Sequence, residues 1–395
     1  MRWNHPIIDA DAHVNEPLDL WDNYLANDFQ GRGPHVVEFD HAGRLERGWQ
    51  FEASDKPTPF IILVNGAGIS PFEWANAADG YAEGRKGAWD PAARISDMDI
   101  DGVYAAALFP SYVMGGSRVY SKDPAVQVAC TEAYNNWHSD FCSYDPARLW
   151  GLAMIPMTGV DDAVRELKRA RELVGIRGVL LAAWPNGSVA SPDHARDDRF
   201  WAAAADLDMP VIVHVGFFED LGFDPADAPP PDTVSPPDFL SLGAMTRAGA
   251  AMMPVLSNLL SGGILDRHPN LRWGLAEAGA GWIPFFLEQF EHVWYHHRFG
   301  FGKSSPSSSY RYLPSELWCR QGFATMMRDK YAVAHWDDPA LINSVSWSSD
   351  FPHTLTPWPN SRLDIADQFG HLPDEARQNF LYKNAARLYG VTMAP

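Results

Sequence analysis

The feature that most constrains the fold is a series of short apolar segments, rich in Val, Ile, Leu and Ala, separated by helical patterns. The apolar segments are residues 7–8, 103–109, 149–154, 178–181, 210–214, 271–276, 322–326 and 344–347. The helical patterns are 91–98, 124–144, 161–174, 200–207, 282–297 and 374–388. Continuous apolar runs are typical of strands buried on both faces of a parallel sheet. The alternation predicts an α/β fold, a TIM (β/α)8 barrel, although a doubly wound sheet would alternate in the same way.

Two segments interrupt this alternation. Residues 25–88, after the first strand, are rich in Gly, Pro and aromatic residues and show no clear period. Residues 217–241, after the fifth strand, are rich in proline. Loops that follow barrel strands lie on the catalytic face, so we expect an insertion at 25–88 and a lid-like loop at 217–241 within one barrel spanning 1–395. Passive surface insertions are the alternative.

The composition excludes several classes of protein. The net charge is −19, and no basic run provides the face that a nucleic-acid-binding protein needs. No run of about 18 apolar residues is present, so we expect no membrane span. The N-terminus lacks a signal-peptide pattern, and the three cysteines form no CxxC pair. We therefore expect a cytoplasmic protein that acts on a small molecule.

Side chains of the metal-ligating types stand at the carboxyl ends of three predicted strands. Asp11 and His13 end the first strand, His214 ends the fifth, and Asp350 ends the eighth. Residues i and i+2 of a strand point the same way, so Asp11 and His13 can face one ion. Each signal is weak alone, because a histidine after a strand is more often a core residue and an aspartate is often a helix N-cap. Together they indicate one divalent metal ion, zinc first, with manganese or iron as alternatives.

Four longer motifs resemble the amidohydrolase superfamily over nearly the whole chain. They are IIDADAHVNEP, PVIVHVG, HPNLRWGLAEAGAGWIPFFLEQFE and SSDFPH. The chain is most similar to the amidohydrolase-related branch, which includes aminocarboxymuconate-semialdehyde decarboxylase and the γ-resorcylate and carboxyvanillate decarboxylases. The resemblance implies that Asp11, His13, His214 and Asp350 ligate the metal, with Asp11 where relatives carry His or Glu. It also implies that Asp350 is a base toward metal-bound water, and that the protein is a homo-oligomer.

The chain departs from those decarboxylases at one position. They carry a catalytic histidine just after the sixth strand, where this chain has Glu277. The catalytic candidates are therefore Asp350, Glu277 and His214. To deliver a proton, Glu277 needs its pKa raised by roughly 2–3 units from about 4.3, which burial can provide.

Two reactions and one non-catalytic role follow from this departure. We expect a non-oxidative decarboxylase acting on a small aromatic or unsaturated carboxylic acid. The alternative is a hydrolase of an amide, ester or lactone that uses metal-activated water, because an ionised carboxylate suits that chemistry without a pKa shift. A non-catalytic binding barrel is a third hypothesis, which the intact set of ligand types disfavours.

The candidates for substrate binding are Trp347 and His353, which flank Asp350, together with Trp184 near a strand end. Trp282 is also near a strand end. Three arginines are candidates for binding a substrate carboxylate, although their spacing gives no support for this: Arg47, Arg118 and Arg320. The histidines of the predicted helix 282–297 are expected to lie on a solvated face: His292, His296 and His297.

Overall fold

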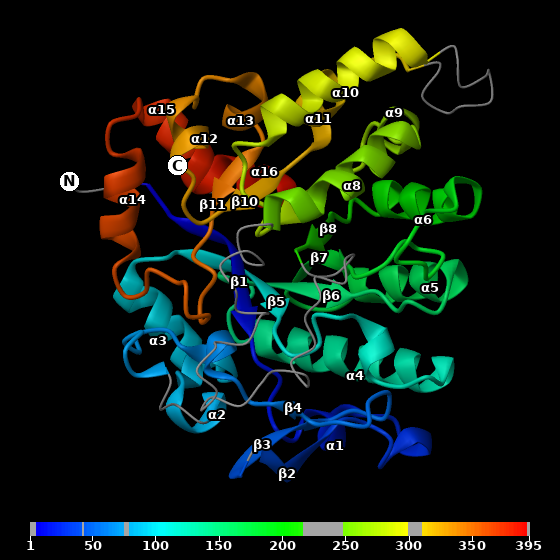
Figure 1. The fold of residues 1–395 in the computed structure, drawn as a ribbon, viewed down its shortest axis with the longest axis vertical. Helices are drawn as coiled ribbons and strands as arrows, with labels where there is room; N and C mark the ends of the chain where they lie inside the picture. Colours follow the sequence, from blue (N-terminus) through cyan, green and yellow to red (C-terminus); the bar gives the residue numbers. More distant parts are fainter. Residues whose placement is uncertain (1–4, 42, 75–78, 216–247, 299–309, 393–395) are drawn as a thin grey trace.

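In the computed structural model, residues 5–41, 43–74, 79–215, 248–298 and 310–392 are described. Eight parallel strands form one sheet in the order in which they occur along the chain. They are β1 (Ile8–Val14), β5 (Ala105–Pro110), β6 (Leu149–Met154), β7 (Ile176–Leu181), β8 (Val211–His214), β9 (Trp273–Ala276), β10 (Ala324–Met326) and β11 (Val345–Trp347). The strands lie at the centre of the molecule and helices surround them (Figure 1).

The sheet curves into a nearly closed barrel. The chain just after β11 returns to β1, where the Asp350 N–H donates to the Asp11 carbonyl at 3.0 Å and the His13 N–H donates to the Phe351 carbonyl at 2.6 Å. The predicted TIM barrel is confirmed, and the expected strands lie within a few residues of the observed ones. β1 extends to Val14, so Asp11 lies at its middle and His13 next to its last residue.

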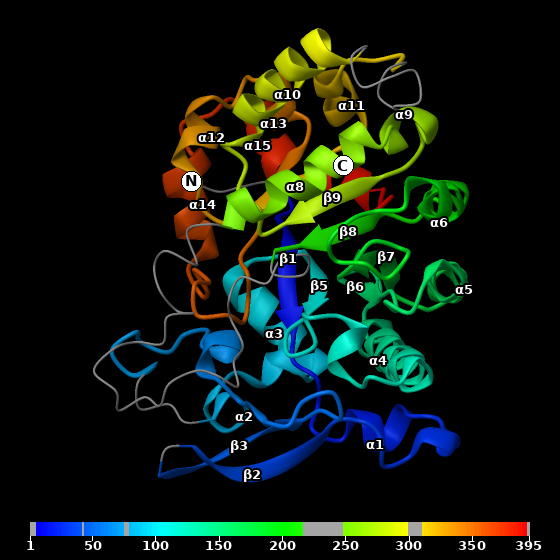
Figure 2. The same cartoon turned by 45° about the vertical axis from the view of Figure 1, so that its right-hand side comes forward.

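Most of the helices cover the outside of the barrel, while α1 and α2 lie beside β2 and β3 (Figure 2). They are α1 (Leu20–Tyr24), α2 (Gly80–Glu83), α3 (Pro91–Asp101), α4 (Pro124–Ser143), α5 (Val160–Arg171), α6 (His194–Asp206), α8 (Ala248–Ser261), α9 (Ile264–Arg267), α10 (Ile283–His297), α11 (Pro314–Gln321), α12 (Lys330–Ala334), α13 (Pro339–Ile342), α14 (Ser361–Phe369), α15 (Asp374–Gln378) and α16 (Asn384–Leu388). Their sequences explain where several begin: Asp90 and Asp123 each cap the first turn with a carboxylate, and proline follows each of them.

The insertion after β1 contains a small antiparallel sheet that its sequence did not indicate. β2 (His35–His41) pairs with β3 (Arg44–Gln50), and β3 pairs with β4 (Thr58–Pro59). Aromatic contacts join it to α1 and to the loop after β5. The ring centroids of Trp49 and Trp21 of α1 are 5.1 Å apart, and those of Phe60 and Tyr112, two residues past β5, are 5.7 Å apart. The insertion therefore lies near the carboxyl end of β5. The expected lid-like loop at 217–241 lies outside the described residues.

No helix in the described part of the chain is both long enough and apolar enough to cross a membrane.

Candidate metal centre

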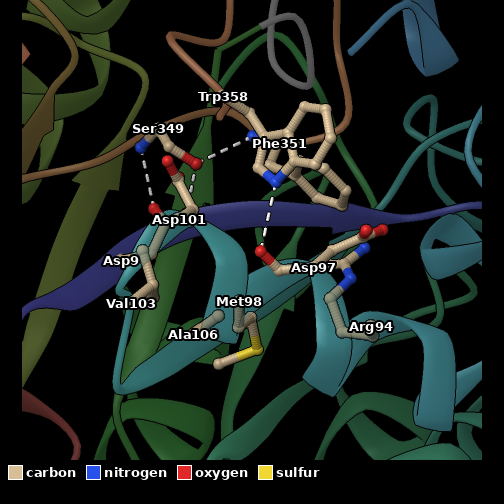
Figure 3. A pocket seen from close by; sticks show the side chains of 10 residues that line it. All are labelled: Asp9, Arg94, Asp97, Met98, Asp101, Val103, Ala106, Ser349, Phe351 and Trp358. Carbon is tan, nitrogen blue, oxygen red and sulfur yellow. Dashed lines mark hydrogen bonds between the residues drawn. The ribbon is translucent and has the colours of Figure 1, made fainter. Parts of the chain in front are cut away.

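A bulge in β1 sets the direction of the acidic residues in its motif. Asp9 pairs with Ala106 and Ala12 pairs with Leu108, so β1 carries one more residue than β5 between these two pairs. Asp9 consequently lines a small cavity beside α3, with Arg94 and Ser349 (Figure 3). Asp11, within the bulge, and His13, beyond it, both turn toward His214.

The residues predicted as ligands come together inside the barrel at the carboxyl ends of the strands. His214 Nε2 lies 3.5 Å from Asp11 Oδ1, and His13 Nε2 lies 3.8 Å from the same oxygen. Asp350 reaches the cluster from the segment after β11, with Oδ1 3.2 Å from His13 Nε2. Residues far apart in the sequence thus bring two imidazoles and two carboxylates together, with His13 next to both carboxylates.

These side chains form two overlapping groups with the geometry of a metal site. Asp11, His13 and His214 make one group, in which the three ligand atoms lie within 4.8 Å of one another. His13, Asp350 and His353 make the other, so the structure adds His353 to the predicted set. His353 Nδ1 lies 3.0 Å from Asp350 Oδ1, and its ring stacks on that of His13 with centroids 4.0 Å apart.

Backbone carbonyls orient both imidazoles for a cation. His13 Nδ1 lies 2.8 Å from the Pro110 carbonyl, and His214 Nδ1 lies 2.9 Å from the Val215 carbonyl. A proton on each Nδ1 would donate to these carbonyls and leave Nε2 of both rings as the ligand atom. Burial, with His353 beside it, lowers the pKa of His13 to about 4, which favours the neutral ring that a metal requires.

The chemistry of the donor set fits a divalent cation. Asp11 Oδ1, His13 Nε2 and Asp350 Oδ1 are buried and make no hydrogen bond of normal geometry within the described residues. Burial of His214 lowers its pKa, but the nearby Asp11 and Glu277 outweigh burial and raise it to about 9. The neighbouring carboxylates thus favour positive charge at this point, and a bound cation would supply it.

Glu277 lies at the edge of this cluster. It follows β9, and its Oε2 lies 3.7 Å from His214 Nε2. The side chain is 23% exposed, so it borders both the cluster and the solvent. Burial, with Asp350 nearby, raises the pKa of Glu277 to about 8. A carboxyl group is therefore close enough to the proposed ligands to exchange a proton with a molecule bound there.

Two residues of the site adopt a backbone conformation that is unusual outside glycine. In the described chain, positive φ at a non-glycine residue occurs at Asp208, Glu277 (φ 54°) and Asp350 (φ 58°). Such conformations cost about 1–3 kcal/mol and gather at functional sites. The alternative role of Asp350 as a helix N-cap is wrong, because the next helix, α14, begins only at Ser361.

The predicted substrate contacts have different surroundings. His353 belongs to the cluster, and its Nε2 lies 3.4 Å from the Ser111 hydroxyl. Trp347 and Trp184 are buried, Trp347 in β11 and Trp184 after β7. Trp282 donates from its indole to the Ala278 carbonyl.

The charged candidates outside the cluster have partners elsewhere or face solvent. Arg47 pairs with Asp79 at 2.6 Å, and Arg320 stacks on Tyr312. Arg118 lies after β5, in the short turn Ser117–Val119. The three histidines of α10 are exposed, as expected: His292, His296 and His297.

The roles of three supporting residues were missed from the sequence. Arg94 of α3 is buried, donates to the carbonyls of His13 and Gly87, and stacks on Phe351. The Thr325 hydroxyl lies against Asp11, and Ser349 binds Asp9. None carries a sequence signal, since each acts through a contact between distant segments.

Comparison with known proteins agrees with this architecture. The profile of a family described as "Amidohydrolase" matches residues 8–391. A 2-amino-3-carboxymuconate-6-semialdehyde decarboxylase of Dictyostelium discoideum is 25% identical over 204 residues, which is 52% of this chain and 52% of that protein. The match thus spans about half the length of this curated relative.

Two solved structures share the fold over almost the entire chain. An amidohydrolase of Mycobacterium avium subsp. paratuberculosis K-10 has a TM-score of 0.72 at 19% identity, covering 98% of this chain and 100% of that one. The 5-carboxyvanillate decarboxylase of Novosphingobium aromaticivorans has a TM-score of 0.65 at 14% identity, covering 98% and 97%. That decarboxylase was solved with manganese and 4-hydroxy-3-methoxy-5-nitrobenzoic acid.

Proposed function

The chain belongs to the amidohydrolase family, and from this we propose that it is a metal-dependent, non-oxidative decarboxylase of a small aromatic or unsaturated carboxylic acid. The observation that carries the proposal is the cluster of Asp11, His13, His214 and Asp350 at the carboxyl ends of the barrel strands, with Glu277 beside it. Active sites of TIM-barrel enzymes lie at this end. The decarboxylases among its relatives and structural neighbours support the choice of reaction.

We propose that the four clustered residues hold one divalent cation, with zinc as the first candidate. The manganese in the structural neighbour makes manganese the next candidate, and iron suits the same ligand types. A bound cation would act as a Lewis acid toward the substrate carboxylate and a neighbouring oxygen. His353 is either a further ligand or a substrate contact, because it approaches Asp350 as closely as His13 does.

Glu277 is the proposed proton donor. When the bond between the substrate carbon and its carboxylate breaks, carbon dioxide leaves and the bonding electron pair remains on that carbon. A protonated Glu277 would give its proton to the carbon and become a carboxylate. Because the side chain is partly exposed, solvent can then return the proton. The buried Trp347 and Trp184 are proposed to form walls of the substrate pocket.

Release of carbon dioxide tests this function. Wild-type protein reconstituted with zinc or manganese should release carbon dioxide from at least one member of a panel of hydroxybenzoates. The Glu277→Gln variant should lose about 10²- to 10⁴-fold in kcat, which is the usual contribution of a general acid. It should retain its metal, because Glu277 is not a proposed ligand. Hydrolysis of amides, esters or lactones without any release of carbon dioxide would refute the proposal.

One observation favours hydrolysis as a second candidate. Glu277 is a carboxylate at the position where the resembling decarboxylases carry a histidine, so three carboxylates surround the two imidazoles. An ionised carboxylate suits proton removal from water better than proton delivery to carbon. Glu277, whose pKa is raised to about 8, would take this role above that pH, and Asp350 is the other candidate base. The cytoplasmic location and the homo-oligomeric state stay predictions, the second of which size-exclusion chromatography would test.

A further inference from the structure

We propose that Thr325 is a positioning residue that fixes Asp11 as a one-oxygen metal ligand and couples it to the backbone of Glu277. The inference rests on the proposed metal site but not on the reaction that the site performs. Thr325 lies in the middle of β10 and is buried. Its hydroxyl oxygen is 2.9 Å from Asp11 Oδ2 and 2.7 Å from the Glu277 backbone nitrogen.

The direction of both hydrogen bonds is determined by the groups involved. A backbone N–H can only donate, so the Thr325 oxygen accepts from Glu277. An ionised carboxylate can only accept, so the hydroxyl hydrogen points to Asp11. Valine has the shape of threonine but lacks both the donor and the acceptor, and would therefore lose both bonds.

The bond from Thr325 determines which oxygen of Asp11 remains for a cation. Oδ2 is engaged by the hydroxyl. Oδ1 is buried, makes no hydrogen bond of normal geometry and faces the Nε2 atoms of His214 and His13 at 3.5 and 3.8 Å. Asp11 therefore presents a single oxygen in a fixed orientation. Without the hydroxyl, the carboxylate would be able to rotate and offer both oxygens.

The same hydroxyl anchors the turn that carries Glu277. The pairing of Leu275 with Ala324 places Thr325 beside this turn. Farther along the turn, Asp329 accepts from the N–H groups of Ala280 and Gly281 at 2.9 and 2.7 Å. The left-handed conformation of Glu277 is thus held on both sides. Thr325 accepts from the N–H of Glu277, and Asp329 accepts from the N–H groups that follow later in the same turn.

A purely structural role is the competing explanation, because threonine suits buried strands in any case. A structural role predicts that Thr325→Val changes stability and leaves the metal coordination as it was. A positioning role predicts a change in metal affinity and coordination that serine, which restores the hydroxyl, reverses. Partners that orient metal ligands typically contribute about 10- to 100-fold in affinity.

The test compares three variants of the full-length apoprotein with the wild type: Thr325→Val, Thr325→Ser and Thr131→Val. Thr131 is the matched control, since it is buried in α4 and its hydroxyl donates to the Gln127 carbonyl at 2.8 Å, away from the cluster. The dissociation constant for zinc is measured by competition with a chromogenic chelator, and the visible absorption of the cobalt(II) form reports the coordination. Circular dichroism verifies that each variant is folded.

We expect Thr325→Val to bind zinc about 10- to 100-fold more weakly and to change the cobalt spectrum, while Thr325→Ser and Thr131→Val keep wild-type values. Zinc affinity and a cobalt spectrum unchanged in Thr325→Val would overturn the inference, even if the protein proves to be a decarboxylase. If the wild type binds metal and the expected pattern appears without any release of carbon dioxide, the inference stands and the proposed reaction fails. A wild-type chain that binds neither zinc nor cobalt would refute the metal site and the inference together.

Discussion

Lowering the pH from 8 to 5 should destabilise the wild-type protein by about 2 kcal/mol more than it destabilises a His138→Asn variant. His138 lies on α4 and is fully buried. Its ring stacks on Trp137, with ring centroids 5.7 Å apart, and meets Tyr134 edge-on, with centroids 5.4 Å apart. Burial, with the Arg94 guanidinium nearby, lowers the pKa of His138 from 6.5 to about 3. The folded protein therefore keeps this imidazole neutral at pH 5.

The magnitude follows from the difference in proton binding between the folded and unfolded chains. Because the pKa of His138 is depressed by folding, its full contribution to stability is present above 6.5 and is lost as the pH falls from 6.5 toward 3. A pH of 5 is about 1.5 units below the pKa of His138 in the unfolded chain, so the imidazole is protonated there. In the folded chain, where the pKa is about 3, the imidazole stays neutral. At about 1.36 kcal/mol per unit, this gives about 2 kcal/mol.

Urea unfolding followed by tryptophan fluorescence at pH 5, 6, 7 and 8 measures the effect. His138→Asn should be less stable than the wild type at pH 8, because asparagine packs poorly against the two rings, and the gap should narrow by about 2 kcal/mol at pH 5. His371→Asn, at an exposed histidine, controls for the loss of an imidazole from the unfolded chain. A gap between His138→Asn and wild type that is the same at pH 5 and pH 8 would refute the neutral, buried state of His138.

Three further predictions concern the site and its surroundings. Asp350→Asn should hold less than one metal ion per chain after dialysis, measured by atomic absorption, because the substitution removes the carboxylate that approaches His13 and His353. Full retention of the metal would exclude Asp350 as a ligand. Removal of metal with a chelator should lower Tm in differential scanning calorimetry, since metal at about 100 times its Kd stabilises the folded state by about 2.7 kcal/mol; an unchanged Tm would contradict the metal site. Gly279→Ala should lower the free energy of unfolding, measured in urea, by about 1–2 kcal/mol, because Gly279 has φ +62°, a backbone conformation that strains alanine. The added methyl group would meet no atom closer than 3.8 Å, so a clash does not contribute. Unchanged stability would show that the turn relaxes.

The barrel and the clustering of the candidate ligands could be predicted because local signals determine both. Apolar runs such as 149–154 and 210–214 have the composition of strands buried on two faces, and the structure places strands there. In a parallel barrel the carboxyl ends of all strands meet at one end. His214 and Asp350 therefore had to approach Asp11, although well over a hundred residues separate each from the next.

The parts that were missed depend on contacts between distant segments. The hairpin of β2 and β3 is held by cross-strand pairs and by aromatic contacts such as Trp49 on Trp21, while its strands show only a weak alternation of exposed and buried residues. His353 joined the cluster because the chain turns immediately after Asp350, with the His353 N–H donating to the Asp350 carbonyl at 2.8 Å. A threonine in an apolar strand gave no indication that its hydroxyl would reach Asp11 across β11.

The bulge in β1 explains how one short motif can carry two carboxylates with different tasks. In a regular strand Asp9, Asp11 and His13 would share a face, and a further carboxylate would crowd the cation. The extra residue turns Asp9 toward Ser349, whose N–H and hydroxyl both donate to it. Asp9 thereby fastens the segment that ends in Asp350 to the strand that carries Asp11, at the point where the barrel closes. Because this contact holds the two proposed ligands in register, Asp9→Asn should weaken metal binding although Asp9 lines a different cavity. An unchanged metal affinity would mean that the two backbone hydrogen bonds, from Asp350 to Asp11 and from His13 to Phe351, are sufficient.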